Sequence, residues 1–301
     1  MVQTETTFTN FAGIRSRTFG VSLIMEFVGV MIFSFLGSTV TGEMTPWVNG
    51  LALAVLIYAA ANISGGHLNP AVTLSTVLCG FYPLIHAALY IVLQCVGAIC
   101  GSLLAAGLLP GTTIGMGKTG PGCFDISPAA AKAGLTRGQV FGWEVVMTFT
   151  LISAVYACGV AKPGHGSFTP LVVGLTLVAC AGTGGKWTGG ALNPARVVGP
   201  AAVFKCSKNI WWVYILAQLL AALLACAVFI IVSGPGPLFP FKSMKDFNLS
   251  HAEAVHMLIT GQPPKRLRQN DDDDATDIMD RVAEKKAAAK DVSDARAARD
   301  V

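Results

Sequence analysis

The tripeptide Asn-Pro-Ala occurs twice in this chain, as Asn69, Pro70 and Ala71 and again as Asn193, Pro194 and Ala195. Asn is a favoured N-cap and Pro is favoured at the first helical position, so each copy predicts a helix start. Where two such starts meet, their unpaired backbone N–H groups and positive dipole ends disfavour a cation. The Asn amides can also donate hydrogen bonds to a solute oxygen. The pair predicts a site that recognises small uncharged molecules.

Two further polar side chains lie beside these copies. Arg196 follows the second copy directly, in strongly apolar surroundings. Because a cation inside a membrane costs about 2.5 to 3.5 kcal/mol on insertion scales, we expect Arg196 to face a wet cavity. His67 lies two residues before Asn69. A lone His is more often packed than functional, but pore lining and pH sensing both stay open for it.

Glu26 and Glu144 each lie within a long apolar run, where a carboxylate facing lipid would be costly. One interpretation makes them proton-relay groups of a coupled transporter. The other makes them acceptors for unpaired backbone N–H groups of loops that re-enter the membrane. We favour the second, because each half of the chain has one such loop to hold. Gln94 and Gln218 are placed similarly, and we expect them to form hydrogen bonds between helices.

The remaining reactive residue types give no sign of catalysis. The sequence contains no nucleophile elbow, metal-ligand cluster or phosphate-binding loop. Seven of the eight cysteines lie in or beside apolar stretches without C-x-x-C spacing, and Cys123 lies in a loop. We interpret the cysteines as small packing residues. We expect no enzyme activity, no metal and no cofactor.

Composition places most of the chain in a membrane. Hydrophobic residues make up 53% of the 301 residues and charged residues only 13%, against roughly 25% charged in a soluble domain. The net charge of +4 is modest, and the basic residues are scattered over loops and tail. The protein is therefore expected to contact the lipid bilayer and no nucleic acid.

Apolar segments of two lengths must position the polar residues. Six are long enough to span a bilayer, at about 20–40, 48–64, 84–108, 138–161, 168–185 and 210–233. Two more, about 69–79 and 193–203, are too short. Because they begin at the Asn-Pro-Ala copies, we expect them to be half-helices that re-enter from opposite faces.

The two halves of the chain repeat each other. Residues 64–71 return as 188–195 and residues 90–94 return as 214–218, both at an offset of 124 residues. Each half holds three spans and one half-helix, and an odd number of spans inverts the second copy. The predicted fold is an all-α membrane protein with six transmembrane helices, two re-entrant half-helices and an inverted internal repeat.

Composition also divides the chain into three parts. An N-terminal segment covers 1–17, and the membrane domain covers 18–236, with repeats at about 18–110 and 136–236. A Gly-Pro-Gly-Pro run then breaks the last helix, and charge rises from Lys242. We expect the remainder, 237–301, to be a charged and largely disordered tail.

The sequence resembles the major intrinsic protein, or aquaporin, family over about residues 15–235. The resemblance rests on residues 67–73, His-Leu-Asn-Pro-Ala-Val-Thr, and on 193–196, Asn-Pro-Ala-Arg. It implies a passive channel, one pore per subunit, a homotetramer and cytosolic termini. It also implies that Asn69 and Asn193 meet in the pore and oppose proton hopping, and it favours a pore-lining role for His67.

By the same resemblance, the narrowest part of the pore falls on Asn49, Ala181, Gly190 and Arg196. Water-selective members typically place an aromatic ring and a His opposite the Arg, and glycerol facilitators follow it with Asp, where this chain has Val197. The residues present imply a wider, more polar constriction, similar to plant tonoplast-type members. We expect water to pass together with ammonia, urea or hydrogen peroxide, and glycerol remains a candidate.

Two other functions stay open. Broken helices that meet at the membrane midplane also build the substrate sites of secondary transporters. A junction or scaffold protein with this fold would conduct little, although intact Asn69, Asn193 and Arg196 argue against a lost pore. The positive-inside rule does not decide the orientation. The membrane also stays open between the plasma membrane and a vacuole-like compartment.

Overall fold

The computed structural model describes residues 16–264 except for 112–113, 119, 127 and 207–208. Six helices of this part are long and apolar enough to cross a membrane. They are α2 (Ser16–Thr39), α3 (Thr45–Ser64), α5 (Leu84–Leu108), α7 (Arg137–Val155), α8 (Thr169–Thr188) and α10 (Trp211–Ser233). The predicted all-α membrane fold with six spans is confirmed.

Short turns extend three of the spans. Single 3-10 turns, Gly42–Met44 and Gly166–Phe168, lead into α3 and α8, and a π-helical turn, Tyr156–Val160, continues α7. Helix α8 also runs three residues past its expected end. Like α3, it ends just before a glycine in the left-handed region. Gly189 after α8 has φ 86°, and Gly65 after α3 has φ 88°.

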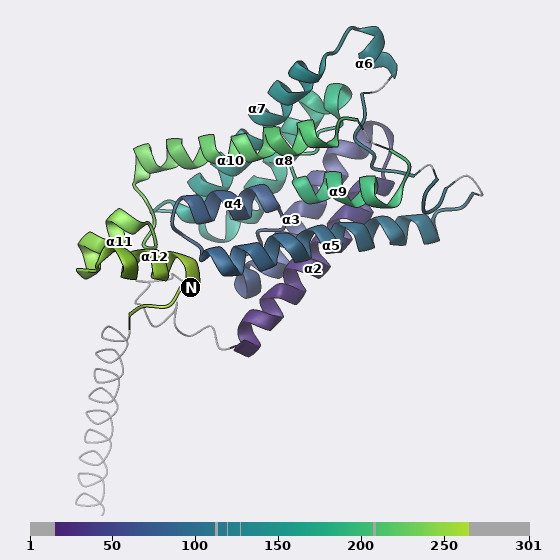
Figure 1. The fold of residues 1–301 in the computed structure, drawn as a ribbon. Coiled ribbons are helices and arrows are strands. Elements are labelled where there is room, and N and C mark those ends of the chain that lie inside the picture. Colours follow the sequence, from purple (N-terminus) through teal and green to yellow (C-terminus); the bar gives the residue numbers. More distant parts are fainter. Residues whose placement is uncertain (1–15, 112–113, 119, 127, 207–208, 265–301) are drawn as a thin grey trace, which may run out of the picture. The chain divides into compact units, whose positions relative to one another are not determined.

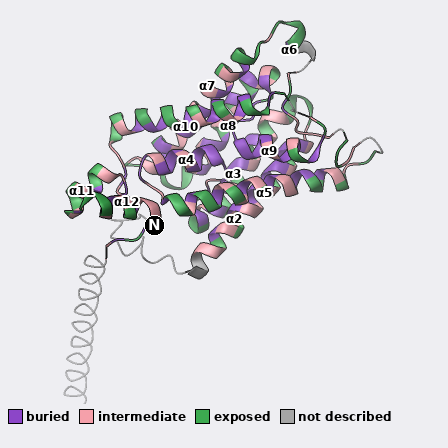
Figure 2. Cartoon of the chain, in the orientation of Figure 1, coloured by how far each residue is buried: buried purple, intermediate pink, exposed green. Residues whose placement is uncertain are grey.

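Two short helices begin at the Asn-Pro-Ala copies, α4 (Pro70–Leu78) and α9 (Pro194–Val203). In Figure 1 they lie end to end between α10 and α5, and each contacts both of those spans. Figure 2 shows α4 and α9 as mostly buried, whereas the spans around them carry exposed faces. The predicted half-helices are therefore enclosed by the long helices.

Close helix contact builds the wall around these half-helices. Where α3 crosses α8, a Cβ on Gly50 would lie 2.4 Å from the Gly174 carbonyl, and a Cβ on Gly174 would lie 2.4 Å from the Gly50 carbonyl. Only glycine fits either position at this backbone distance. The largest buried apolar cluster lies beside this crossing and includes Phe33, Leu68 and Leu192.

The described part of the tail that was expected to be largely disordered contains two helices. Helices α11 (Pro240–Phe247) and α12 (His251–Thr260) follow α10, and α12 contacts α5. The sequence carries the stop and start signals: Ser250 and Glu253 form a capping box, and Gly261 ends α12 with φ 71°. The charged composition of 237–301 predicts disorder, but these local signals favour helix within its first residues. Residues 265–301 and the N-terminal segment up to residue 15 lie outside the described residues.

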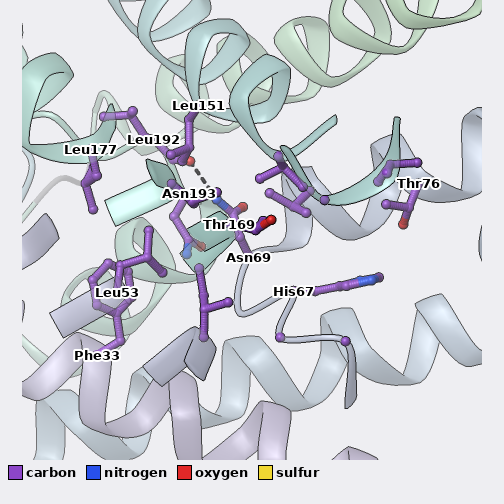
Figure 3. Close-up of a pocket in the computed structure, with 18 of the residues that line it drawn as sticks. Phe33, Leu53, His67, Asn69, Thr76, Leu151, Thr169, Leu177, Leu192 and Asn193 are labelled. Carbon is purple, nitrogen blue, oxygen red and sulfur yellow. Dashed lines mark hydrogen bonds between the residues drawn. The ribbon is translucent and has the colours of Figure 1, made fainter. Parts of the chain in front are cut away.

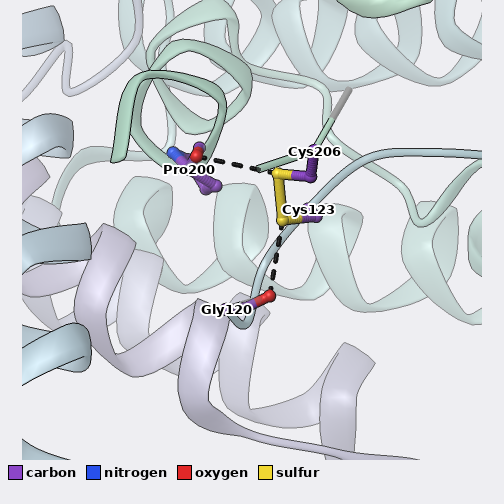
Figure 4. The surroundings of a disulfide bond; sticks show 4 residues. All are labelled: Gly120, Cys123, Pro200 and Cys206. Atoms are coloured by element: carbon purple, nitrogen blue, oxygen red, sulfur yellow. Dashed lines mark hydrogen bonds between the residues drawn. A yellow bond between two sulfur atoms is a disulfide. The ribbon is translucent and has the colours of Figure 1, made fainter. Parts of the chain in front are cut away.

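The interpretation of all eight cysteines as packing residues is wrong for two of them. Cys123 and Cys206 form a disulfide across 83 residues of sequence (Figure 4). The first lies in the loop after α5, which contains the short helix α6 (Pro128–Lys132), and the second lies between α9 and α10. Both loops follow helices that run toward the same membrane face, so the inverted repeat brings them together. The other six cysteines are free thiols.

Candidate functional site

The two Asn-Pro-Ala copies form helix caps of the same geometry. The Asn69 side-chain oxygen accepts the Ala71 N–H at 2.9 Å, and the Asn193 oxygen accepts the Ala195 N–H at 3.0 Å. Both Asn residues have extended backbones before the Pro that opens the helix. The caps leave the amide nitrogen of each Asn available for other partners.

Each of those nitrogens bonds to the opposite half of the chain. Asn69 Nδ2 donates to the Leu192 carbonyl at 2.9 Å, and Asn193 Nδ2 donates to the Leu68 carbonyl at 2.8 Å. Leu68 and Leu192 are fully buried and have φ of 47° and 50°, a left-handed conformation that is costly for a branched side chain. The two loops therefore hold each other in a strained and specific shape.

Glu26 fixes the loop before α4. Its Oε1 accepts from Ser64 Oγ at 2.6 Å and the His67 N–H at 3.0 Å. Its Oε2 accepts from the Leu68 N–H at 2.7 Å and Gln94 Nε2 at 2.8 Å. Glu26 is fully buried. A carboxylate without solvent is stabilised here by four donors, two of which are backbone N–H groups of the loop before α4.

Glu144 makes the matching set of contacts before α9. Its Oε1 accepts from Thr188 Oγ1 at 2.7 Å and the Ala191 N–H at 3.1 Å. Its Oε2 accepts from the Leu192 N–H and from Gln218 Nε2, both at 3.0 Å. The side chain is fully buried. Each half therefore uses one glutamate and one glutamine to hold its own loop.

A tyrosine completes each set, and sequence reasoning missed this pair. Tyr90 donates its hydroxyl to the Ser64 carbonyl at 2.9 Å, and Tyr214 donates to the Thr188 carbonyl at 2.7 Å. Both tyrosines are buried and are 124 residues apart. Their recurrence at the offset of the repeat was the signal that could have identified them.

A cavity of about 150 Å³ runs past the two Asn side chains. In Figure 3, Asn69 and Asn193 lie in the middle of the lining, His67 lies on one side and Phe33 on the other. Most of the wall is apolar, and none of the described residues that line it is Asp, Glu, Lys or Arg. An uncharged solute would meet few polar groups apart from these amides.

His67 lines this cavity and contacts two tyrosine rings. Its Nδ1 lies 3.2 Å from Thr73 Oγ1, and its ring centroid lies 5.0 Å from Tyr82 and 5.5 Å from Tyr90. Tyr82 belongs to the loop between α4 and α5, where burial raises the pKa of its phenol. The Tyr82 hydroxyl therefore stays protonated and can donate.

The four residues expected at the constriction form two contacting pairs. Arg196 Nη1 donates to Asn49 Oδ1. A Cβ on Gly190 would lie 3.2 Å from Ala181 Cα, so these two backbones are also neighbours. None of the four lines the cavity around the Asn pair. Arg196 lies next to the cavity-lining Phe33, whose ring centroid is 4.9 Å from Arg196 Cζ.

Arg196 is 4% exposed and is held by more than one partner. Its Nη2 donates to the Gly37 carbonyl at 3.1 Å, while Asn49 Nδ2 donates to the Thr45 carbonyl at 2.8 Å. The buried Nε of Arg196 has no hydrogen-bond partner within the described part of the chain. Arg196 thus keeps one N–H that its neighbours do not use.

Together, the six spans, the two half-helices and the shared cavity define a membrane channel with an inverted repeat. The chain belongs to the major intrinsic protein family, whose model matches residues 13–230. This is a family of channels rather than enzymes.

Curated relatives agree with this assignment. The chain is 34% identical over 230 residues to probable aquaporin TIP1-2 of Oryza sativa subsp. japonica, covering 69% of this chain and 85% of the relative. It is 35% identical over 225 residues to nodulin-26 of Glycine max, covering 70% and 77%. It is 32% identical over 227 residues to aquaporin PIP1-5 of Zea mays, covering 73% and 75%. The similar identities favour no single subgroup.

A solved structure supports the fold. The X-ray structure of the aquaglyceroporin from Plasmodium falciparum superposes with a TM-score of 0.59 at 24% identity. The match covers 75% of this chain and 99% of that chain. The arrangement of six spans around two half-helices is therefore shared with an experimental structure.

Proposed function

We propose that this protein is a passive channel for water and small neutral solutes that excludes protons and ions. The observation that carries the proposal is the cross-bonded pair Asn69 and Asn193 on the wall of one cavity. Each amide has two N–H groups, and the opposite loop uses one of them. The second N–H of each Asn is available to a solute oxygen.

The same geometry accounts for the exclusion of charge. The N-termini of α4 and α9 meet at the Asn pair, so the positive ends of both helix dipoles act on one point of the cavity. A cation there loses its hydration and meets positive potential. A water molecule that accepts from the Asn amides cannot also accept a proton from its neighbour, which interrupts proton hopping.

The carboxylates support a channel over a coupled transporter. A proton-coupled transporter needs a titratable group that reaches its pathway. Glu26 and Glu144 are fully buried, each accepts four hydrogen bonds, and neither lines the cavity. Both carboxylates instead accept hydrogen bonds that hold the loops before α4 and α9.

The constriction supports passage of solutes larger than water. Ala181 and Gly190 present at most a methyl group, and Asn49 is bound to Arg196 and to the Thr45 carbonyl. None of these four residues is aromatic, so they offer polar contacts from small or amide side chains. We propose that ammonia, urea and hydrogen peroxide pass with water, and that glycerol passes more slowly.

The disulfide supports cytosolic termini. Counted along the six crossings, Cys123 and Cys206 fall on the membrane face opposite to the start of α2 and the end of α10. Disulfides persist in extracellular or luminal compartments and are rare in the cytosol. We therefore place the termini in the cytosol, with the channel in the plasma membrane or a vacuole-like compartment. Family resemblance supports assembly as a homotetramer.

Stopped-flow light scattering on vesicles that contain the purified protein tests this function. Osmotic water flow would be compared with uptake of urea, ammonia and glycerol, for wild type and for Asn49→Phe/Ala181→His. Fast water flow with urea or ammonia uptake that the double variant reduces selectively is the expected result. Water flow alone, unchanged by the substitutions, would contradict the solute range. No flow of any solute would favour a scaffold protein.

A further inference from the structure

The loop after α5 is fastened to the end of the second half-helix. Gly117 N–H donates to the Val203 carbonyl at 2.7 Å, and Lys205 N–H donates to the Lys118 carbonyl at 2.8 Å. Figure 4 shows the Cys123–Cys206 disulfide that links the same two segments. Two backbone bonds and one covalent bond therefore fix the loop at the outer end of α9.

The loop also fits closely against its neighbours. A Cβ on Gly122 would lie 2.2 Å from Ser38 Oγ at the end of α2, and Gly122 has φ 76°, which other residues rarely adopt. Phe124, two residues further, is 5% exposed and has its ring centroid 5.7 Å from Tyr214. The position of Phe124 is thus set by the close fit of Gly122 before Cys123 and by the contact of its own ring with Tyr214.

Phe124 reaches the constriction. Arg196 Cζ lies 5.7 Å from the Phe124 ring centroid and 4.9 Å from that of Phe33, so the cation contacts two aromatic rings. Phe33 comes from α2 and lines the cavity, whereas Phe124 comes from the outer loop. A guanidinium within about 6 Å of a ring centroid is attracted to the ring face, more strongly where water is excluded.

We propose that Phe124, fixed by the Cys123–Cys206 disulfide, is a positioning residue for Arg196 and thereby a determinant of solute specificity. The Arg196 guanidinium has polar partners in Asn49 and Gly37 and aromatic partners in Phe33 and Phe124. Loss of the Phe124 ring, or release of its loop, removes one of these restraints. The guanidinium then samples other rotamers, and the constriction admits larger solutes more readily.

This inference rests on the proposed channel function, and the ratio of urea to water permeability in the same vesicles tests it. Phe124→Leu keeps an apolar side chain and removes the ring, whereas Phe124→Tyr keeps the ring. We expect Phe124→Leu to raise the ratio several-fold and at most about thirtyfold, the factor that corresponds to a desolvated cation–π contact of about 2 kcal/mol. Phe124→Tyr should stay near the wild-type ratio, as should Phe168→Leu, a control at a position that is 65% exposed.

The disulfide provides a second measurement that needs no change at Phe124. Dithiothreitol added to wild-type vesicles should raise the urea-to-water ratio in the same direction as Phe124→Leu. Cys123→Ala/Cys206→Ala should show the raised ratio without reductant and no further response to it. Cys100→Ser, which removes a free half-buried thiol of α5, should behave as wild type. The reductant arm decides the question if Phe124→Leu fails to fold.

The outcomes separate this inference from the proposed function. Wild-type vesicles without water flow would overturn the channel itself and this inference with it. In a second outcome, wild-type vesicles conduct water while the urea-to-water ratio is unchanged or lower in both Phe124→Leu and reduced wild type. That result would overturn the positioning role alone. A raised ratio in Phe124→Tyr equal to that in Phe124→Leu would also overturn it, because the ring would then be irrelevant.

Discussion

Asn69 donates its side-chain amide to the carbonyl of Leu192, 2.9 Å away, across the boundary between the two halves of the repeat. The mirrored bond joins Asn193 to Leu68 at 2.8 Å. Each Leu also gives its own N–H to the glutamate of its own half. The loops before α4 and α9 are therefore each held by a glutamate acceptor from their own half and an asparagine donor from the other half. Neither half can complete the cavity wall alone.

The first prediction concerns that cross-bond. Asn193→Ala removes the cap of α9, worth about 0.5–2 kcal/mol, and leaves the buried Leu68 carbonyl without its donor, at about 1–3 kcal/mol. We expect a lower apparent Tm of the purified protein in detergent and reduced water flow in vesicles. Asn209→Ala, at an exposed position between α9 and α10, is the control. Equal stability of the two variants would show that the cross-bond contributes little.

The second prediction concerns the buried carboxylates. In Glu26→Gln, the new NH₂ group must face a backbone N–H donor, either that of His67 or that of Leu68, so at least one buried hydrogen bond is lost. Each lost bond costs about 1–3 kcal/mol, and Glu144→Gln should cost about the same because its contacts match. Thermal unfolding in detergent measures both, with the exposed Glu43→Gln as control. A stable Glu26→Gln with altered pH dependence of transport would instead support a proton-relay role.

Much of this architecture could be predicted because repetition is visible in sequence. The six spans follow from length and apolar composition, and the helix starts follow from Asn and Pro at fixed positions. Roles for Glu26 and Glu144 followed from the cost of a carboxylate in a membrane. Each of these inferences needs only local chemistry or the repeat offset.

The rest depended on contacts between distant segments. Nothing near Cys123 in sequence indicates Cys206 as its partner, because the pairing arises only when two outer loops meet. The same is true of Phe124, which reaches Arg196 through the folded loop. Helices α11 and α12 have start and stop signals in the sequence. The charge of the residues that follow favours a prediction of disorder for the whole segment.

The third prediction concerns the contact between α3 and α8. A methyl group on Gly174 would lie 2.4 Å from the Gly50 carbonyl, so Gly174→Ala must push the two helices apart. Overpacking of this kind costs about 1–3 kcal/mol. Gly185→Ala in the same helix has no atom within 4 Å of the new methyl group and should be tolerated. Apparent Tm values in detergent compare the two, and equal values would contradict the close contact.

The last prediction concerns Gly37, whose carbonyl accepts from Arg196 Nη2 at 3.1 Å. A Cβ at this position would lie 2.2 Å from Asn49 Oδ1 and 2.9 Å from Arg196 Nη2. Because both side chains are buried, Gly37→Ala must displace the end of at least one of them. The predicted consequence is a changed solute preference together with a stability loss of about 1–3 kcal/mol, as is typical of overpacking.

Gly20→Ala is the matched control, since it lies in the same helix and its Cβ would meet no atom within 4 Å. Urea, glycerol and water permeabilities would be measured for both variants in vesicles with equal protein content. A shift of the urea-to-water ratio in Gly37→Ala alone places Arg196 and Asn49 at the step that selects solutes. If Gly37→Ala and Gly20→Ala share the wild-type ratio, selection occurs elsewhere along the pore, and the wall around Asn69 and Asn193 becomes the next segment to vary.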